Sequence, residues 1–474
     1  MLSFSFLFSV SEASRLLSFC PHFVPGLLSR KSNCFSSSPC TNSANRLRSM
    51  AVTTCLTWTQ EKRLQNYFGG KQFSLLYKAT CQGFYHHGLF DKCYDQGPAL
   101  IVVYSGDHVI GAYMPVGLKN ERVPIIAFAL QETEISECKI GSHFFSNSCR
   151  NIGPSEFNID LSNKKVNMHA ETIKKLGLPQ CNAISIEECE AFRLEDILSE
   201  RRMKYVTELR KQLLSEIRTY KPYGNLVHQA RILLLGPTGA GKSSFINSVK
   251  SIFRGHVTQQ VLVGSDPGGT SKKYRTYSIK DGEDGNLLPF MLCDSLGLGE
   301  EGEGLCTDDI VSILKGHIPD RYQFIPTKPI APGHGDYINN PSLKDRIHCV
   351  AFVLDAKSVE HLSHEMTAKI KQIRSDMIKY GVVHLALLTN VDNLDLITEN
   401  DLVDIQKCVP VKSKVQAVHR VLGFALSDIL VVSNYSSTWE LDSVRDVLIL
   451  SVLREMLWAA DDYLEDLPCE FVEI

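Results

Sequence analysis

A glycine-rich loop with one lysine and one serine carries the residues of this chain best suited to chemistry. Residues 236–243 read Gly-Pro-Thr-Gly-Ala-Gly-Lys-Ser, a full match to G-x-x-x-x-G-K-[ST], between an apolar run at 232–235 and a helix-like stretch at 243–253. Glycines let backbone N–H groups surround phosphate oxygens, the lysine reaches the β and γ phosphates, and the serine hydroxyl binds Mg²⁺. We therefore expect a nucleoside triphosphate site; a plain strand-to-helix turn is the weaker interpretation. The expected phosphate-binding residues are Gly236, Thr238, Gly239, Ala240, Gly241, Lys242, Ser243 and Ser244.

A second segment supplies a carboxylate and a glycine. Asp294-Ser-Leu-Gly297 follows an apolar strand and matches D-x-x-G. The aspartate is expected to bind Mg²⁺ together with Ser243, and the N–H of Gly297 to sense the γ phosphate. The pattern is weak alone, but its place after the phosphate loop and at a strand end makes it strong. Thr270 is the expected switch threonine on Mg²⁺, and Thr258 is the alternative.

Two further segments predict which nucleotide base the site binds. Thr389-Asn390-Val391-Asp392 follows an apolar strand where GTPases typically carry [N/T]-K-x-D, and Asp392 can accept hydrogen bonds that guanine offers and adenine does not. Asn390 replaces the lysine whose stem covers the base, so guanine preference should survive with lower affinity. A polar turn is the alternative interpretation. Ser433 and Asn434 follow the last strand and are expected to contact guanine O6.

Hydrolysis is expected to be slow. Leu298 follows Gly297 where Ras-like GTPases have the glutamine that orients water, and Thr238 stands where they have a glycine. We expect self-association through this domain, or a partner, to raise the rate.

Alternating apolar strands and helices after residue 230 predict an α/β domain with a mainly parallel sheet. The expected strands are 231–235, 274–279, 288–293, 348–354, 382–388 and 429–432. Residues 51–200 instead contain a helix at 57–66 and many short strands with frequent turns, which indicates an antiparallel sheet or sandwich. Apolar positions near helical spacing predict one long helix over 192–220.

Bulk composition excludes several classes of protein. The net charge of −3 gives no general attraction to nucleic acid or anionic membrane. No stretch is apolar and long enough to span a bilayer. The 15 cysteines include no C-x-x-C pair, which favours reduced thiols in a cytosolic protein over a disulfide scaffold or zinc site. Residues 1–49 resemble a targeting segment only loosely, and we expect them to be disordered and outside the fold.

The chain resembles the interferon-induced protein 44 family. The resemblance covers about residues 50–474, and most of the segments that carry it lie outside the general GTPase motifs. They include Asn66-Tyr-Phe-Gly-Gly70, Tyr274-Arg-Thr-Tyr-Ser-Ile279, Leu292-Cys-Asp-Ser-Leu-Gly-Leu298 and Leu457-Trp-Ala-Ala-Asp-Asp462. The family lacks the usual lysine beside Asp392 too. The resemblance implies an interferon-induced, cytoplasmic protein of antiviral innate immunity.

Together these observations predict four regions. Residues 1–49 form an extension, 51–200 a TLDc-like β-sandwich domain with helices, 201–222 a linker helix, and 223–467 a P-loop GTPase-like α/β domain. The cofactors would be GTP or GDP with Mg²⁺, and the TLDc-like domain would bind an unidentified protein partner. The alternative is an interaction protein in which the P-loop domain binds nucleotide without significant turnover.

Overall fold

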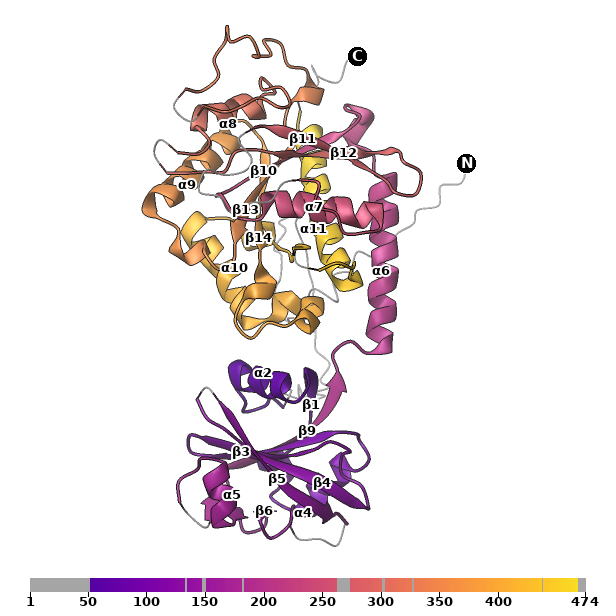
Figure 1. Ribbon diagram of the computed structural model, residues 1–474, viewed down its shortest axis with the longest axis vertical. Coiled ribbons are helices and arrows are strands. Elements are labelled where there is room, and N and C mark those ends of the chain that lie inside the picture. The colour runs from indigo at the N-terminus through magenta and orange to yellow at the C-terminus, as the bar shows by residue number, and fades with distance from the viewer. Residues whose placement is uncertain are drawn as a thin grey trace, which may run out of the picture. The chain divides into compact units, whose positions relative to one another are not determined.

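The computed structural model describes residues 52–132, 134–146, 151–180, 183–261, 273–300, 303–325, 328–436 and 438–467. The expectations for residues 1–49 and for Thr270 lie outside these ranges. The chain is mixed α/β, with three sheets among the described residues. It divides into two compact units between Ser199 and Glu200, and each unit is described by itself (Figure 1).

The N-terminal unit contains a six-stranded antiparallel sheet and a three-stranded one. The large sheet has the order β1 (Lys71–Lys78), β9 (Glu188–Asp196), β2 (Ala99–Ser105), β3 (His108–Met114), β4 (Arg122–Leu130) and β5 (Ile135–Phe144). The small sheet has the order β6 (Phe157–Asp160), β7 (Lys165–Met168) and β8 (Ala183–Ser185). The α-helices described before Ser199 are α2 (Trp58–Tyr67), α3 (Ala79–Gln82), α4 (His86–Cys93) and α5 (Ala170–Lys175).

Both faces of the large sheet are covered, which explains why β2 is apolar at successive positions. Side chains along a strand alternate between the two faces. Leu100 belongs to the hydrophobic cluster that contains Leu64 of α2. Ile101, the next residue, belongs to the cluster that contains Phe157 of the small sheet. Helix α2 begins where expected, because Thr57 forms a capping box with its N-terminal turn.

The single helix expected over 192–220 is wrong in its first part. Residues 188–196 form strand β9, and helix α6 (Glu200–Thr219) begins only after it. Phe192 pairs with Leu75 of β1 on one side and with Leu100 of β2 on the other. A strand in this position is normally apolar throughout, but β9 contains two buried glutamates. These charged residues interrupt the apolar pattern of a buried strand, and the apolar residues that remain match the spacing of a helix.

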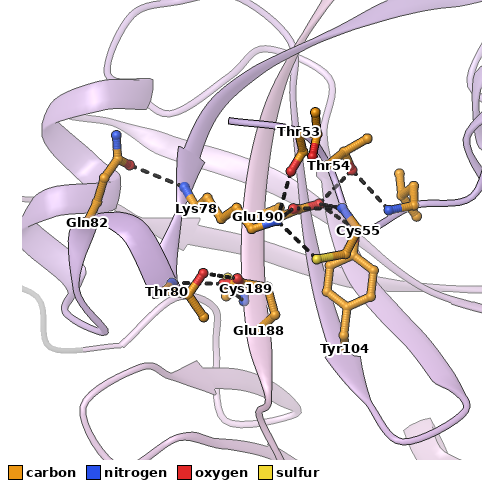
Figure 2. A network of polar contacts seen from close by, with 11 residues as sticks. Thr53, Thr54, Cys55, Lys78, Thr80, Gln82, Tyr104, Glu188, Cys189 and Glu190 are labelled. Carbon is orange, nitrogen blue, oxygen red and sulfur yellow. Dashed lines mark hydrogen bonds and ion pairs between the residues drawn. The ribbon is translucent and has the colours of Figure 1, made fainter. Parts of the chain in front are cut away.

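Hydrogen bonds compensate the burial of Glu190 in β9 (Figure 2). Its carboxylate accepts hydrogen bonds from Tyr104 Oη (2.5 Å), Thr54 Oγ1 (2.7 Å) and the Cys55 N–H (2.9 Å), and pairs with Lys78 Nζ at 3.0 Å. Burial alone would raise the pKa of Glu190, but the hydrogen bonds outweigh it and hold the pKa below its ordinary value. This network joins the segment before α2 to the centre of the sheet.

The C-terminal unit is built on a six-stranded sheet in which five strands are parallel. Its order is β11 (Arg275–Lys280), β12 (Leu287–Asp294), β10 (Ala230–Leu235), β13 (Cys349–Asp355), β14 (Val383–Thr389) and β15 (Ile429–Val431), and only β11 runs antiparallel to its neighbour. Each strand lies within about two residues of its expected position. The carboxyl ends of the parallel strands share one edge, where an open α/β sheet binds its ligands.

Helices surround this sheet. They are α6, α7 (Lys242–Arg254), α8 (Thr307–Leu314), α9 (His364–Lys379), α10 (Val409–Leu422) and α11 (Ser443–Glu465) among the described residues. Ile232 and Leu234 of β10 share a hydrophobic cluster with α7 and α11. The expected linker helix, α6, packs as part of this unit: Arg210 Nε pairs with Asp446 Oδ2 of α11 at 2.5 Å, and Tyr220 Oη donates to Asp461 at 2.7 Å.

Candidate nucleotide-binding site

The glycine-rich loop joins β10 to α7 and has a backbone that requires glycine at two positions. A Cβ on Gly236 would lie 2.0 Å from the carbonyl oxygen of Val353, so only glycine fits against β13. Gly241, immediately before α7, has a φ of +93°, a conformation that other residues rarely adopt. No side chain caps the N-terminus of α7. Its first N–H groups are therefore left for an anion, as in phosphate-binding loops.

Lys242 lies inside this loop. Its side chain is buried, and Nζ donates hydrogen bonds to the carbonyl oxygens of Gly236 (2.8 Å) and Pro237 (2.9 Å). Burial lowers the pKa of Lys242 to about 8, and the charge of Asp294 only partly opposes this shift. Neutral carbonyls compensate a buried ammonium poorly, whereas phosphate oxygens would compensate it well.

Ser243 and Asp294 meet at the carboxyl end of the sheet. Ser243 Oγ, in the first turn of α7, donates to Asp294 Oδ2 at 2.9 Å, and Asp294 is the last residue of β12. Its side chain is buried. A hydroxyl and a carboxylate are hard oxygen donors of the kind that Mg²⁺ prefers. The two residues thus fit a Mg²⁺ ion bound between them.

The segment after Asp294 lies directly against the loop. The N–H of Leu298 donates to the carbonyl oxygen of Gly236 at 2.9 Å. A Cβ on Gly297 would stand 2.3 Å from Thr238 Oγ1, so the two residues approach closely. The Leu298 side chain is buried, with 2% of its surface exposed. It is apolar and turned away from water, and cannot orient a water molecule as a glutamine would.

The residues expected to bind the base also gather at this edge of the sheet. The Thr389 hydroxyl is buried and donates to the carbonyl oxygen of Ala240 at 2.7 Å, so it ties β14 to the phosphate loop rather than facing a base. Asn390 adopts the left-handed conformation with a φ of 55°. Asn434 Nδ2 donates to the carbonyl oxygen of Gly241 at 3.4 Å. These contacts bring the ends of β14 and β15 to the start of α7.

Sequence reasoning missed Arg445, which lies beside Asp392. Its Nη2 is 4.0 Å from Asp392 Oδ2 and 2.7 Å from Glu399 Oε2, and the residue is 3% exposed. Arg445 stands in the first turn of α11, far from Asp392 in the sequence, and nothing in its surroundings marks it. Only the fold brings it to the candidate base site.

The alternative switch threonine, Thr258, is not beside the loop. Its backbone N–H donates to Ser251 Oγ at 2.9 Å, and its hydroxyl accepts from Arg254, the last residue of α7. Eight residues of α-helix separate Ser251 from Ser243, which corresponds to about 12 Å. Thr258 therefore does not reach an ion held by Ser243.

A cavity of about 200 Å³ borders the loop, lined by Pro237 to Ala240, by the end of β13 including Asp355, and by residues after it including Ser358. Within the described residues, no helix combines the length and apolar character needed to cross a bilayer.

Comparison with known proteins gives matches over most of the chain. The TLDc domain model matches residues 51–125. Interferon-induced protein 44 from Pan troglodytes is 61% identical over 89% of this chain and 96% of its own length. The protein of that name from Homo sapiens is 60% identical over the same shares. Human interferon-induced protein 44-like is 43% identical over 89% of this chain and 97% of its own length.

Two solved structures are more distant. A probable GTP-binding protein engB is 12% identical, covers 49% of this chain and 99% of its own, and has a TM-score of 0.28. A complex titled SsGBP and GDP is 16% identical, covers 56% of this chain and 58% of its own, and has a TM-score of 0.23. At these TM-scores we draw nothing from the two structures.

Proposed function

This chain belongs to the interferon-induced protein 44 family, and we propose that it is a GTP-binding protein whose nucleotide state acts as a switch. The hydrogen bond between Ser243 and Asp294 is the observation that carries this proposal. It joins the phosphate loop to the D-x-x-G segment in the way that a shared Mg²⁺ ion requires. Lys242, buried with only carbonyl acceptors, adds a charge that a phosphate would compensate.

In this proposal the residues of the loop cradle the phosphates, and Lys242 neutralises charge on the β and γ phosphates. Ser243 and Asp294, joined by Thr270, would hold Mg²⁺, which would offset negative charge on the phosphates. Gly297 senses the γ phosphate through its N–H group. Asp392 selects guanine, with Asn390, Ser433 and Asn434 beside it. Ordering of the segment that contains Thr270 by the γ phosphate would be the switch.

Hydrolysis is proposed to be slow or assisted by a partner. The buried, apolar Leu298 supports this proposal, because no side chain at this position can orient the attacking water. The same observation favours a second function, an interaction protein that binds nucleotide without significant turnover. A turnover assay over a range of protein concentrations separates the two. A rate per molecule that rises with concentration favours assistance by self-association, and no turnover at any concentration favours the interaction protein.

The names of the relatives extend the proposal to the cell. We infer from these names that this protein is interferon-induced, and we propose from the family resemblance that it acts in the cytoplasm in antiviral innate immunity. The N-terminal unit is proposed to be a TLDc-like β-sandwich that binds a protein partner. The match of the TLDc model to residues 51–125 and the shared core of its two sheets support this assignment.

Calorimetric titration of the full chain with GTP, GDP and ATP, each with Mg²⁺, tests nucleotide binding. We expect guanine-selective binding that is lost in Lys242→Ala. We also expect Asp392→Asn to weaken the binding of GTP and to strengthen that of xanthosine triphosphate, because the asparagine amide can donate a hydrogen bond where the carboxylate only accepts. Equal binding of ATP and GTP would contradict the guanine role of Asp392. Absence of any nucleotide binding would contradict the proposal as a whole.

A further inference from the structure

One side chain, that of Tyr435, connects the two ends of the segment that joins β15 to α11. Tyr435 Oη donates to Asp446 Oδ1 at 2.7 Å and also accepts a hydrogen bond from the Asp442 N–H at 2.7 Å. The N–H of Tyr435 itself donates to Ser248 Oγ of α7 at 2.9 Å. Tyr435 is buried. The two ends of this segment are therefore fixed relative to each other and to the helix that follows the phosphate loop.

Each of the two fixed ends lies near residues of the candidate nucleotide site. At the first end, Asn434 Nδ2 contacts the carbonyl oxygen of Gly241 at 3.4 Å. At the second end, Asp442 caps α11 by accepting from the Arg445 N–H at 2.8 Å, and Arg445 lies 4.0 Å from Asp392. Tyr435 is therefore held close to the glycine-rich loop, and Asp442 caps the helical turn whose Arg445 lies near Asp392.

Two buried polar atoms at the start of this segment point to a missing ligand. Ser433 Oγ and Asn434 Oδ1 have no hydrogen-bond partner among the described residues, although Ser433 is 0% and Asn434 4% exposed. Buried polar groups are normally paired, because a buried donor or acceptor without a partner loses its hydrogen bonds to water and gains none in return. A purine that carries both donor and acceptor groups on its edge would satisfy such atoms.

Trp439 lies within this segment and is 93% exposed. A tryptophan normally buries its large ring against another surface. Asn390, with its short side chain, stands where the lysine stem of other GTPases covers one face of the base. We propose that Trp439 stacks on the purine ring of the bound nucleotide and replaces that cover. This inference rests on the proposed guanine nucleotide site and identifies the residue that holds the base.

Calorimetry on the full chain tests the proposal with two ligands, GTP and inorganic tripolyphosphate, both with Mg²⁺. Tripolyphosphate carries the phosphates without the base. Stacking of one base on an aromatic ring corresponds to at least about fivefold in affinity. We expect Trp439→Ala to weaken GTP at least about fivefold and to leave tripolyphosphate unchanged. Trp439→Phe should restore most of the GTP affinity, since phenylalanine also stacks. Trp458→Ala is the matched control and should change neither ligand.

Tryptophan emission gives a second readout, because the chain has only three tryptophans. GTP should change the emission of the unaltered protein, and most of this change should disappear in Trp439→Phe but persist in Trp458→Phe. Unchanged GTP affinity in Trp439→Ala would overturn the inference and leave the nucleotide site intact. An equal loss for GTP and tripolyphosphate would overturn it too, as damage to the loop. If the unaltered protein binds no GTP, the proposed function and this inference fail together.

Discussion

Lys78 in the N-terminal unit and Lys242 in the C-terminal unit are both largely withdrawn from water, yet their partners differ. Lys78 pairs with the Glu190 carboxylate at 3.0 Å. Burial alone would lower its pKa, but the contacts with Cys55 and Glu190 raise the pKa above its ordinary value. Lys242 donates to two neutral carbonyls, and burial lowers its pKa to about 8. The first site is complete without a ligand, whereas the second, in the proposed function, gains a charged partner from the bound nucleotide.

The largest expected effect separates the two sites by stability. Glu190→Ala should destabilise the N-terminal unit by about 3–5 kcal/mol, because Lys78 loses its carboxylate partner and the half-buried hydroxyls of Tyr104 and Thr54 lose their acceptor. Hydrogen exchange read by mass spectrometry can follow each unit separately. Nucleotide binding by the C-terminal unit should persist. Glu195→Ala is the control, since Glu195 lies on the same strand but in an exposed ion pair, and should cost less than about 0.5 kcal/mol. Equal effects of the two substitutions would remove the structural role of Glu190.

Lys242→Met should have the opposite signature. We expect GTP affinity to fall at least 100-fold, about 2.7 kcal/mol, because a buried cation on the phosphates is lost. The stability of the ligand-free C-terminal unit should stay unchanged or rise by about 1 kcal/mol, since a poorly compensated charge is removed. Lys250→Met, in the same helix and also with a pKa lowered to about 8, should retain binding. Marked unfolding of Lys242→Met would make this lysine structural.

The pH dependence of GTP binding should report the protonation of Lys242. The pKa of Lys242 in the free protein is about 8, below the ordinary value of 10.5. Above pH 8 the free protein has lost this proton, so binding must recover it and should weaken by up to tenfold for each pH unit. In the same range the unfolded chain holds more protons than the folded one, so the stability of the ligand-free unit should rise. Calorimetry in buffers of different ionisation enthalpy measures the proton uptake, which Lys242→Met should abolish.

The smallest effect probes one hydrogen bond of the complete site. Tyr104→Phe removes one of the donors to Glu190 and should cost about 1–2 kcal/mol, because a hydrogen bond to a charged group is lost while the others remain. This loss of stability should be smaller at acidic pH. The pKa of Glu190 is held below 4.5, so its stabilising contribution is present above that value and is lost as the pH falls below it. Thermal unfolding of the two proteins at several pH values tests this expectation.

The sequence predicted the parallel sheet and the strand–loop–helix arrangement around residues 236–243 well, because these regions obey simple patterns. The strands around the loop are apolar and buried on both faces, and the loop has a fixed spacing of glycines and lysine. Strand β5 follows no such pattern, because it is an edge strand that pairs only with β4 and is largely exposed, so its sequence is polar. Strand β9 was missed because the charged Glu190 interrupts the apolar run that is typical of a buried strand.

The contacts of the candidate site were predicted where each residue belongs to a recognisable motif at the end of a strand or the start of a helix. Ser243 and Asp294 meet as expected. Arg445 was missed because its relation to Asp392 exists only after α11 packs beside β14. The Thr389 hydroxyl was assigned to the base, yet it holds Ala240 of the loop, because a strand end that supports the loop needs a buried donor. Long-range contacts of this kind leave no local signal.

The hydrogen bonds from Thr54 and Cys55 to Glu190 set a practical limit on how the N-terminal unit can be shortened. A fragment that begins at Leu56 would keep every strand of the large sheet and still remove two of the groups that hold the buried carboxylate. If this fragment loses solubility, the result would resemble a requirement for a protein partner. Its cause would instead be the loss of the two hydrogen bonds to Glu190. Fragments for expression or interaction screens should therefore start at or before Thr53, whose carbonyl oxygen also receives a hydrogen bond from Lys78.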